Sequence, residues 1–209
     1  MDEILRYFPD LTDTQKELFV RAAELYRDLN AQINVISRKD IDNIFPHHIL
    51  HSLAIAKAHP IPDGSVVMDL GCGGGFPGIP LAIMYPASRF ILVDSVGKKI
   101  KVVSEVASAL RLDNVEAVNK RAEELDVKVD YVVSRAVTDL KPFLGWCWDK
   151  VKGGDGHGVL CLKGGDLTEE ISEGIQPYKG ISLCRLYKIS DMFDGEYFHT
   201  KKVLYIRKG

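Results

Sequence analysis

Residues 69–78 read DLGCGGGFPG. These ten positions hold five glycines and begin at the end of the apolar run 65–70. A fixed glycine costs backbone entropy, so a cluster of them indicates a tight turn or a close approach of the backbone to a ligand. A strand, a glycine turn and a helix in this order can bring backbone N–H groups against a bound molecule. The stretch therefore predicts a cofactor-binding turn in an α/β sheet.

The chain on either side of this turn alternates between short β-branched runs and longer amphipathic runs. We expect strands at 65–70, 89–94, 114–118, 130–135 and 158–164, and helices at 78–85, 97–110 and 138–150. This alternation is typical of βαβ units, and hence of a mostly parallel sheet covered on both faces. The last two apolar runs, 181–189 and 201–208, have no helix-length segment between them, so we expect them to pair antiparallel.

The N-terminal part has a helical rhythm instead. Apolar residues recur every three or four positions over 11–31, with Thr12 or Thr14 as the capping residue, and a second helix is expected over 46–58, starting at Pro46. A turn-rich break follows. We therefore predict a helical extension over residues 1–60 and one α/β domain over residues 61–209.

Composition limits the classes of protein that fit. The 209 residues carry a formal net charge of −2, with 46% hydrophobic and 27% charged residues, which is ordinary for a soluble globular protein. No long apolar run or signal core is present, and the four cysteines lack paired spacing. We expect a cytoplasmic protein without a membrane segment, whose contacts with nucleic acid would come from a local basic patch.

The glycine turn fits two kinds of cofactor site. Gly73, Gly75 and Gly78 satisfy G-x-G-x-x-G, and Asp94 ends the next expected strand, as in a dinucleotide site. The same letters fit an Asp69-led pattern of S-adenosylmethionine-dependent methyltransferases, in which the Asp69 carboxylate would meet the cofactor's ammonium group. Pro77 lacks an N–H, which weakens a phosphate-binding helix start. Composition and periodicity alone leave both cofactors open.

Seven stretches together resemble one family. They are INVISRKD (33–40), HHILHSL (47–53), DLGCGGGFPGIPLAI (69–83), LVDSVGKKIKVV (92–103), RAEE (121–124), VVSRAVTDL (132–140) and LKGG (162–165). In this order they look like the RsmG family, also called glucose-inhibited division protein B, of small-subunit ribosomal RNA guanine-N7 methyltransferases. The resemblance covers about residues 30 to 165.

The resemblance implies a Rossmann-like class I methyltransferase fold with S-adenosyl-L-methionine as cofactor. It implies methyl transfer to N7 of one guanine in the decoding region of 16S ribosomal RNA. Among the residues that match the motifs, Gly71, Gly73 and Phe76 would line the cofactor pocket together with Asp69, Asp94 would hold the ribose hydroxyls, and Ala122 and Glu123 would contact the adenine. Arg135 would lie beside the cofactor and the entering base.

The helical motif departs from the family pattern at two positions. The family usually reads Arg-His-x-Leu-Asp-Ser-Leu, whereas here His47 and His51 replace the Arg and the Asp. His48 matches the family histidine, and we expect it beneath the pocket or against RNA. His47 and His51 share a helix face, but without an acidic or cysteine partner nearby in sequence we expect no metal site.

The expected chemistry needs positioning more than acid–base groups. Guanine N7 already carries a lone pair that points into the major groove, so no proton has to be removed and no general base is expected. Arg135 is the candidate for positioning the base. The basic residues expected to contact RNA, together with His48, are Arg38, Lys39, Lys98, Lys101 and Lys163. For the two tryptophans, Trp146 and Trp148, core packing is expected over base stacking.

The predicted partner is 16S rRNA or the small ribosomal subunit, bound by a monomer. Three other functions stay open from the sequence. They are a methyltransferase for a small molecule or a protein, an NAD-dependent oxidoreductase, and an RNA-binding module without catalysis.

Overall fold

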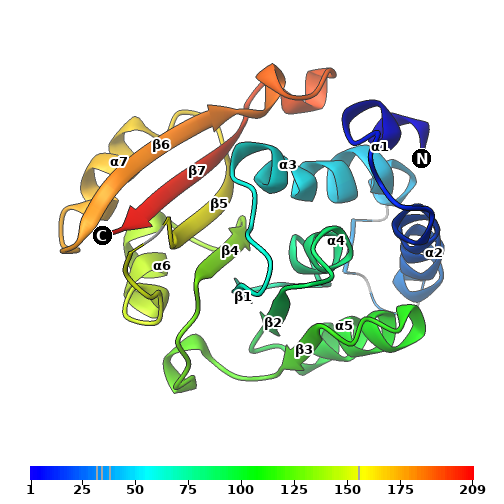
Figure 1. Ribbon diagram of the computed structural model, residues 1–209, viewed down its shortest axis with the longest axis horizontal. Helices are drawn as coiled ribbons and strands as arrows, with labels where there is room; N and C mark the ends of the chain where they lie inside the picture. Colours follow the sequence, from blue (N-terminus) through cyan, green and yellow to red (C-terminus); the bar gives the residue numbers. More distant parts are fainter. Residues whose placement is uncertain (32, 34, 38, 155) are drawn as a thin grey trace.

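The computed structural model describes residues 1–31, 33, 35–37, 39–154 and 156–209, which form a seven-stranded sheet (Figure 1). Its strands are β1 (Val66–Leu70), β2 (Arg89–Val93), β3 (Val115–Val118), β4 (Tyr131–Arg135), β5 (Gly158–Gly164), β6 (Ile181–Lys188) and β7 (Lys201–Lys208). Their order is β3-β2-β1-β4-β5-β7-β6. Strands β1 to β5 run parallel, and β7 pairs antiparallel with both β5 and β6, which confirms the predicted arrangement.

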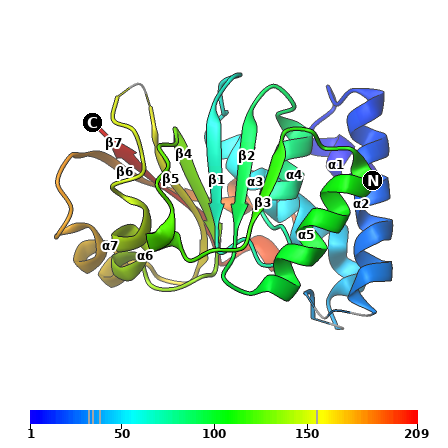
Figure 2. The same ribbon diagram turned by 90° about the horizontal axis from the view of Figure 1, so that it is seen from below.

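Helices cover both faces of the sheet. They are α1 (Asp2–Tyr7), α2 (Asp13–Asn30), α3 (His51–Ala58), α4 (Gly78–Met84), α5 (Gly97–Leu110), α6 (Leu140–Cys147) and α7 (Thr168–Ile175). Helices α6 and α7 lie on one side of the sheet and α1 to α5 on the other (Figure 1), and α2 packs outside α5 (Figure 2). Because alternate strand residues point to opposite faces, Val67 packs in the core beneath α3 to α5, whereas Met68 packs beneath α6 and α7.

Local chemistry explains where the N-terminal helices begin. Thr12 caps α2, because its side chain accepts a hydrogen bond from the Gln15 amide at 3.2 Å while the Gln15 side chain accepts one from the Thr12 amide at 3.0 Å. The helix expected over 46–58 is instead a π-helical turn, Ile44–Leu50, that continues into α3, so Pro46 lies within the turn. Sequence periodicity did not predict α1 or α7.

The N-terminal helices share a core with the sheet. Phe19, Ala22 and Tyr26 of α2 are buried in the same apolar cluster as Val67 of β1 and Phe90 of β2. The division into an extension of residues 1–60 and a domain of residues 61–209 stays a prediction. Across the described residues, no helix is both long and apolar enough to cross a membrane.

The strand register brings the important chain segments to one edge of the sheet. Leu70 at the end of β1 is the partner of Val93 at the end of β2, and Arg135 at the end of β4 is the partner of Leu162 in β5. The carboxyl ends of parallel strands are where open α/β sheets bind ligands.

Candidate active site

The glycine turn after β1 is closed against its neighbours. Gly71 has a φ of +71°, and a Cβ there would lie 2.6 Å from the Val137 side chain. Gly75 has a φ of +103°, and a Cβ there would lie 2.7 Å from the Tyr26 hydroxyl oxygen. Both positions therefore need glycine for their conformation and for the space around them. A side chain at either position would push the turn out of shape.

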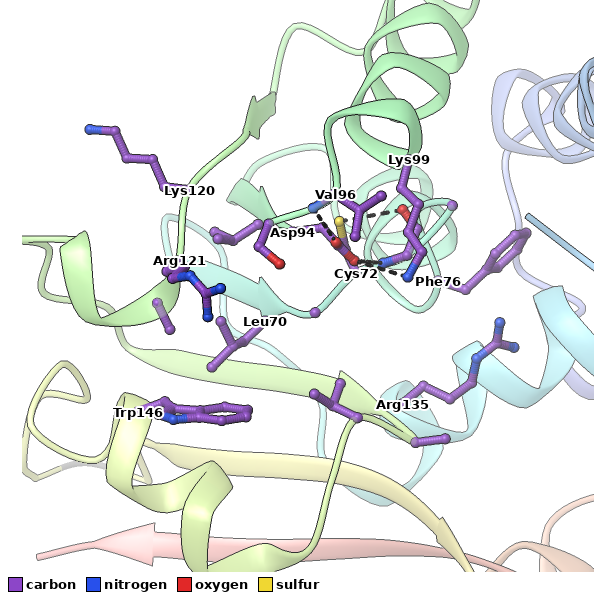
Figure 3. A pocket seen from close by; sticks show the side chains of 18 of the residues that line it. Leu70, Cys72, Phe76, Asp94, Val96, Lys99, Lys120, Arg121, Arg135 and Trp146 are labelled. Atoms are coloured by element: carbon purple, nitrogen blue, oxygen red, sulfur yellow. Dashed lines mark hydrogen bonds and ion pairs between the residues drawn. The ribbon is translucent and has the colours of Figure 1, made fainter. Parts of the chain in front are cut away.

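A cleft of about 410 Å³ lies over this turn (Figure 3). The predicted cofactor residues that line it are Gly71, Gly73, Phe76, Asp94, Ala122, Glu123 and Arg135. Figure 3 shows Phe76 and Arg135 on one side of the cleft and Trp146 and Arg121 on the other. The turns after β1, β2, β3 and β4 thus meet in one cavity, although they are far apart in the sequence.

Asp94, the residue after β2, anchors two backbone segments of the cleft. One carboxylate oxygen accepts a hydrogen bond from the Gly73 amide at 3.0 Å, and the other accepts one from the Val96 amide at 2.8 Å. The Lys99 ammonium lies 3.6 Å away. A carboxylate has about four lone-pair sites, so Asp94 keeps acceptor capacity toward the cleft.

Asp69 lies beneath the glycine turn. Its carboxylate is completely buried, it accepts a hydrogen bond from the Gly78 amide at 2.7 Å, and the residue does not line the cleft. In β1 it shares a face with Val67, so its side chain points under the turn toward α4. Asp69 thus holds the start of α4 against β1, and the contact between its carboxylate and the cofactor's ammonium stays a prediction.

Burial gives Asp69 an expected effect on stability. Loss of hydration raises the pKa of this carboxyl to about 7 from its usual 3.8, despite the hydrogen bond from Gly78. The folded state therefore holds the proton between about pH 4 and pH 7 while the unfolded state releases it. We expect the free energy of unfolding to fall across this range by up to about 4 kcal/mol because of Asp69 alone.

Urea denaturation of the wild type and of Asp69→Asn, measured at several pH values, checks this expectation. The difference in unfolding free energy between the two proteins isolates the carboxyl group, because every other titrating group is shared. The wild type should lose stability relative to the variant as the pH rises toward 7. A difference that stays constant from pH 4 to pH 7 contradicts a raised pKa.

Arg135 ends β4 and belongs to a polar chain. Its guanidinium lies 3.3 Å from Nδ1 of His48, while Nε2 of His48 lies 2.9 Å from an Asp40 carboxylate oxygen. Burial and the charge of Arg135 lower the pKa of His48 to about 4, so the neutral ring donates to Asp40 and accepts from Arg135. The guanidinium also lies over the Phe76 ring, 5.0 Å from its centroid. Arg135 is thus held at the cleft wall from two sides.

The predicted RNA-contacting residues fall into different environments. Lys39, Lys98 and Lys101 are exposed, whereas Arg38 lies outside the described residues. Lys163 is half-buried, and its ammonium donates to the Thr138 carbonyl at 2.6 Å and to the Glu170 carboxylate at 2.7 Å, so its contact with RNA stays a prediction. No group of three or more His, Cys, Asp or Glu among the described residues is arranged to hold a metal ion.

Two site residues were missed by sequence reasoning. Trp146 packs, half-buried, against the apolar core as expected, but it also lines the cleft. Trp148 is buried in the core and donates its indole N–H to the Lys179 carbonyl at 2.9 Å. Tyr26 donates its buried hydroxyl to the Gly74 carbonyl at 2.7 Å and so supports the turn from α2. In the sequence, Tyr26 is one of the apolar residues of the helical run 11–31, a pattern that indicates core packing and no role in a site.

The two tryptophans give an expected optical signal. Only Trp146 lines the cleft, so titration with S-adenosylhomocysteine should change the intrinsic fluorescence of the wild type and of Trp148→Phe. Trp146→Phe should lose most of this change while binding the ligand within about tenfold of the wild type, because one aromatic contact contributes about 0.5–1.5 kcal/mol. A full fluorescence change in Trp146→Phe contradicts this placement of Trp146.

The chain matches known proteins in sequence. A family model described as rRNA small subunit methyltransferase G matches residues 15–182. The chain is 51% identical to "Ribosomal RNA small subunit methyltransferase G" of Flavobacterium johnsoniae, over 99% of this chain and 97% of that protein. It is 48% identical to the protein of the same name from Bacteroides thetaiotaomicron, over 98% of each chain.

Solved structures share the fold at low sequence identity. A SAM-dependent O-methyltransferase from Thermotoga maritima superposes with a TM-score of 0.59 at 15% identity, covering 81% of this chain and 70% of that one. A putative rRNA-methylase from Clostridium thermocellum gives 0.56 at 17% identity, covering 77% of this chain and 95% of that one. These matches, with the strand order, confirm the predicted Rossmann-like class I methyltransferase fold.

Proposed function

The chain belongs to the rRNA small subunit methyltransferase G family, and from this premise we propose that it transfers the methyl group of S-adenosyl-L-methionine to N7 of a guanine in 16S rRNA. The observation that carries the proposal is the cleft in which the glycine turn, Asp94, Ala122–Glu123 and Arg135 meet at the carboxyl ends of the strands. These are the positions that the family motifs mark, brought together by the fold.

The residues of the cleft fit this cofactor. Asp94 is 7% exposed, and its free lone pairs suit the hydroxyls of a ribose. Ala122 and Glu123 lie at the wall where an adenine would be held, and Trp146 adds an aromatic surface. Gly71 lines the cleft without a Cβ, which would clash with Val137. When bound, S-adenosyl-L-methionine supplies an electrophilic methyl group on a sulfonium.

The protein contributes alignment to the reaction. Guanine N7 needs no deprotonation, so the cleft needs no general base. Holding two reactants in the correct geometry supplies an effective molarity of about 10⁵ M or more. Arg135, fixed by His48 and Phe76, positions the base beside the cofactor and offsets the negative charge of the RNA backbone.

The partner is 16S rRNA, free or within the small ribosomal subunit, and the protein acts as a monomer in the cytoplasm without a metal. The exposed lysines Lys39, Lys98 and Lys101 contact phosphates, so RNA affinity falls as the salt concentration rises.

Incubation of the purified protein with methyl-labelled S-adenosylmethionine and rRNA extracted from the small ribosomal subunit tests the proposal. Nucleoside analysis should find the label in 7-methylguanosine. Label in a small-molecule or protein fraction supports a different acceptor, and a rise in melting temperature with NAD but not with S-adenosylmethionine supports an oxidoreductase. Cofactor binding with RNA binding but no transfer supports a module without catalysis.

A further inference from the structure

A second cavity of about 270 Å³ adjoins the cofactor cleft, and the family comparison gives it no role. Arg135 and Ala136 line both cavities. Ala136 has a φ of +51°, a strained value for a residue with a side chain and one that often occurs at active sites. The other lining residues are His48, His51, Leu162, Lys163, Gly164, Tyr197 and Lys201.

His51 lines this cavity and contains an unsatisfied polar atom. It is 5% exposed, its Nδ1 lies 3.1 Å from the Tyr197 hydroxyl, and its buried Nε2 has no hydrogen-bond partner among the described residues. Burial, with the charges of Arg135 and Lys201, lowers the pKa of His51 to about 3, so the ring is neutral. A buried polar atom without a partner is costly, so a hydrogen-bond partner that reaches Nε2 from the cavity would be stabilising.

The hydrogen-bond network favours a proton on Nδ1 of His51. The Tyr197 hydroxyl lies 3.2 Å from the His47 carbonyl oxygen, which can only accept, so Tyr197 donates to it. The Tyr197 oxygen then accepts from Nδ1–H of His51. The His47 ring stacks on Tyr197 with centroids 3.7 Å apart, which holds the phenol in place. With the proton on Nδ1, Nε2 of His51 is a hydrogen-bond acceptor.

We propose that this second cavity holds the extruded acceptor guanine, and that His51 selects guanine by accepting a hydrogen bond from its Watson–Crick edge. Enzymes that modify a base inside structured nucleic acid take it out of the stack and read that edge in a pocket. Guanine presents N1–H and the 2-amino group as adjacent donors. Adenine has the acceptor N1 between its 6-amino donor and C2–H, so in the position of guanine N1–H it would face Nε2 with a second acceptor. The inference rests on the proposed function.

The volume of the second cavity and the charges that line it fit the binding of a single base. The cavity volume of about 270 Å³ lies just below the range of roughly 300–1,000 Å³ for drug-sized ligands, so it suits one base rather than a whole nucleotide. The cavity is also lined by the cationic groups Arg135 and Lys201, which suit a site that must accept the phosphodiester backbone attached to the base. Lys163 is neutralised by Glu170 at 2.7 Å and so acts as part of the wall.

The first test measures base binding without catalysis. The protein is saturated with S-adenosylhomocysteine, which blocks the adenosine site, and is then titrated with guanosine 5′-monophosphate or adenosine 5′-monophosphate. Imidazole nitrogen shifts in ¹⁵N-histidine-labelled protein report on His51, assigned with His51→Phe. The guanine nucleotide should shift Nε2 of His51, and the adenine nucleotide should not. Equal shifts with both, or none with either, overturn the inference.

The second test separates base recognition from a structural role. His51→Phe should lower kcat/KM for rRNA about 10- to 100-fold and keep the affinity for S-adenosylhomocysteine within about twofold. Its Tm should stay near that of the wild type, because removal of the unsatisfied Nε2 offsets the loss of the hydrogen bond between Nδ1–H and Tyr197. His51→Asn, which keeps an acceptor, should recover part of the loss. The matched control is His59→Phe, since His59 contacts the Tyr131 hydroxyl at 3.3 Å, at the opposite end of β4.

An unchanged kcat/KM in His51→Phe, or a lowered Tm with loss of cofactor affinity, overturns the role of His51. The proposed function fails separately, when the wild type makes no 7-methylguanosine even though guanosine 5′-monophosphate still shifts His51.

Discussion

Replacing Asp94 by alanine should raise the Kd for S-adenosylhomocysteine at least about 100-fold and abolish methyl transfer at ordinary cofactor concentrations. The carboxylate accepts hydrogen bonds from the amides of Gly73 and Val96, at 3.0 and 2.8 Å, so its loss frees the glycine turn and the start of α5 together. A hydrogen bond to a charged group contributes about 1.5–3 kcal/mol. Loss of two such bonds, and of the predicted ribose contact, accounts for the expected factor.

Isothermal titration calorimetry with S-adenosylhomocysteine measures this effect. Asp63→Ala is the control, because Asp63 is exposed in the loop before β1, at the other edge of the sheet. It should bind like the wild type. A Kd for Asp94→Ala within about threefold of the wild type, in a protein with unchanged Tm, contradicts the role given to Asp94.

The strand and helix pattern of this chain was predictable because its signals are local. Each run from 89–94 to 158–164 is short, apolar and bounded by turn residues, and the structure places β2 and β5 within a residue of the expected bounds. The turn after β1 was predictable for the same reason, since five glycines and an acid lie within ten residues. A mixed sheet follows from the absence of a helix between the last two strands.

The direction of a side chain was harder to predict than its position. Asp69 was placed at the correct strand end, yet its carboxylate points beneath the turn to Gly78. The alternation of side chains along the strand could have predicted this direction. Val67 packs toward α4, so Asp69, two residues later, points to the same face, whereas Leu70 points to the cleft. The sequence motif suggested a contact between Asp69 and the cofactor, whereas the pleat of the strand determines the direction of its side chain.

Contacts between segments that are far apart in the chain could not be predicted from the sequence. His51 and Tyr197 are separated by 146 residues, and Tyr26 is 48 residues from the carbonyl that it supports. No periodicity links such pairs. The replacement of the usual Arg and Asp by His47 and His51 was visible as a departure, but only the fold shows that both histidines contact Tyr197.

Replacing Arg135 by alanine should lower kcat/KM for rRNA at least about 100-fold, with a change in Kd for S-adenosylhomocysteine of less than about tenfold. Arg135 lines the cofactor cleft and the adjoining cavity, so it lies where the two reactants must meet. A displacement of about 1 Å at such a place can cost about 100-fold in rate. Steady-state kinetics with rRNA and calorimetry with the cofactor product separate the two effects.

Lysine should not rescue this loss, and the reason lies in the shape of the guanidinium. Arg135 reaches His48 Nδ1 at 3.3 Å and the His47 carbonyl at 3.5 Å while lying over Phe76. An ammonium is a point charge that cannot make these contacts in one orientation. Arg185→Ala, at an exposed position on β6, is the matched control and should keep full activity. If the activity of Arg135→Lys is within about threefold of the wild type, a positive charge alone is sufficient. The guanidinium that contacts His48 then does not position the base.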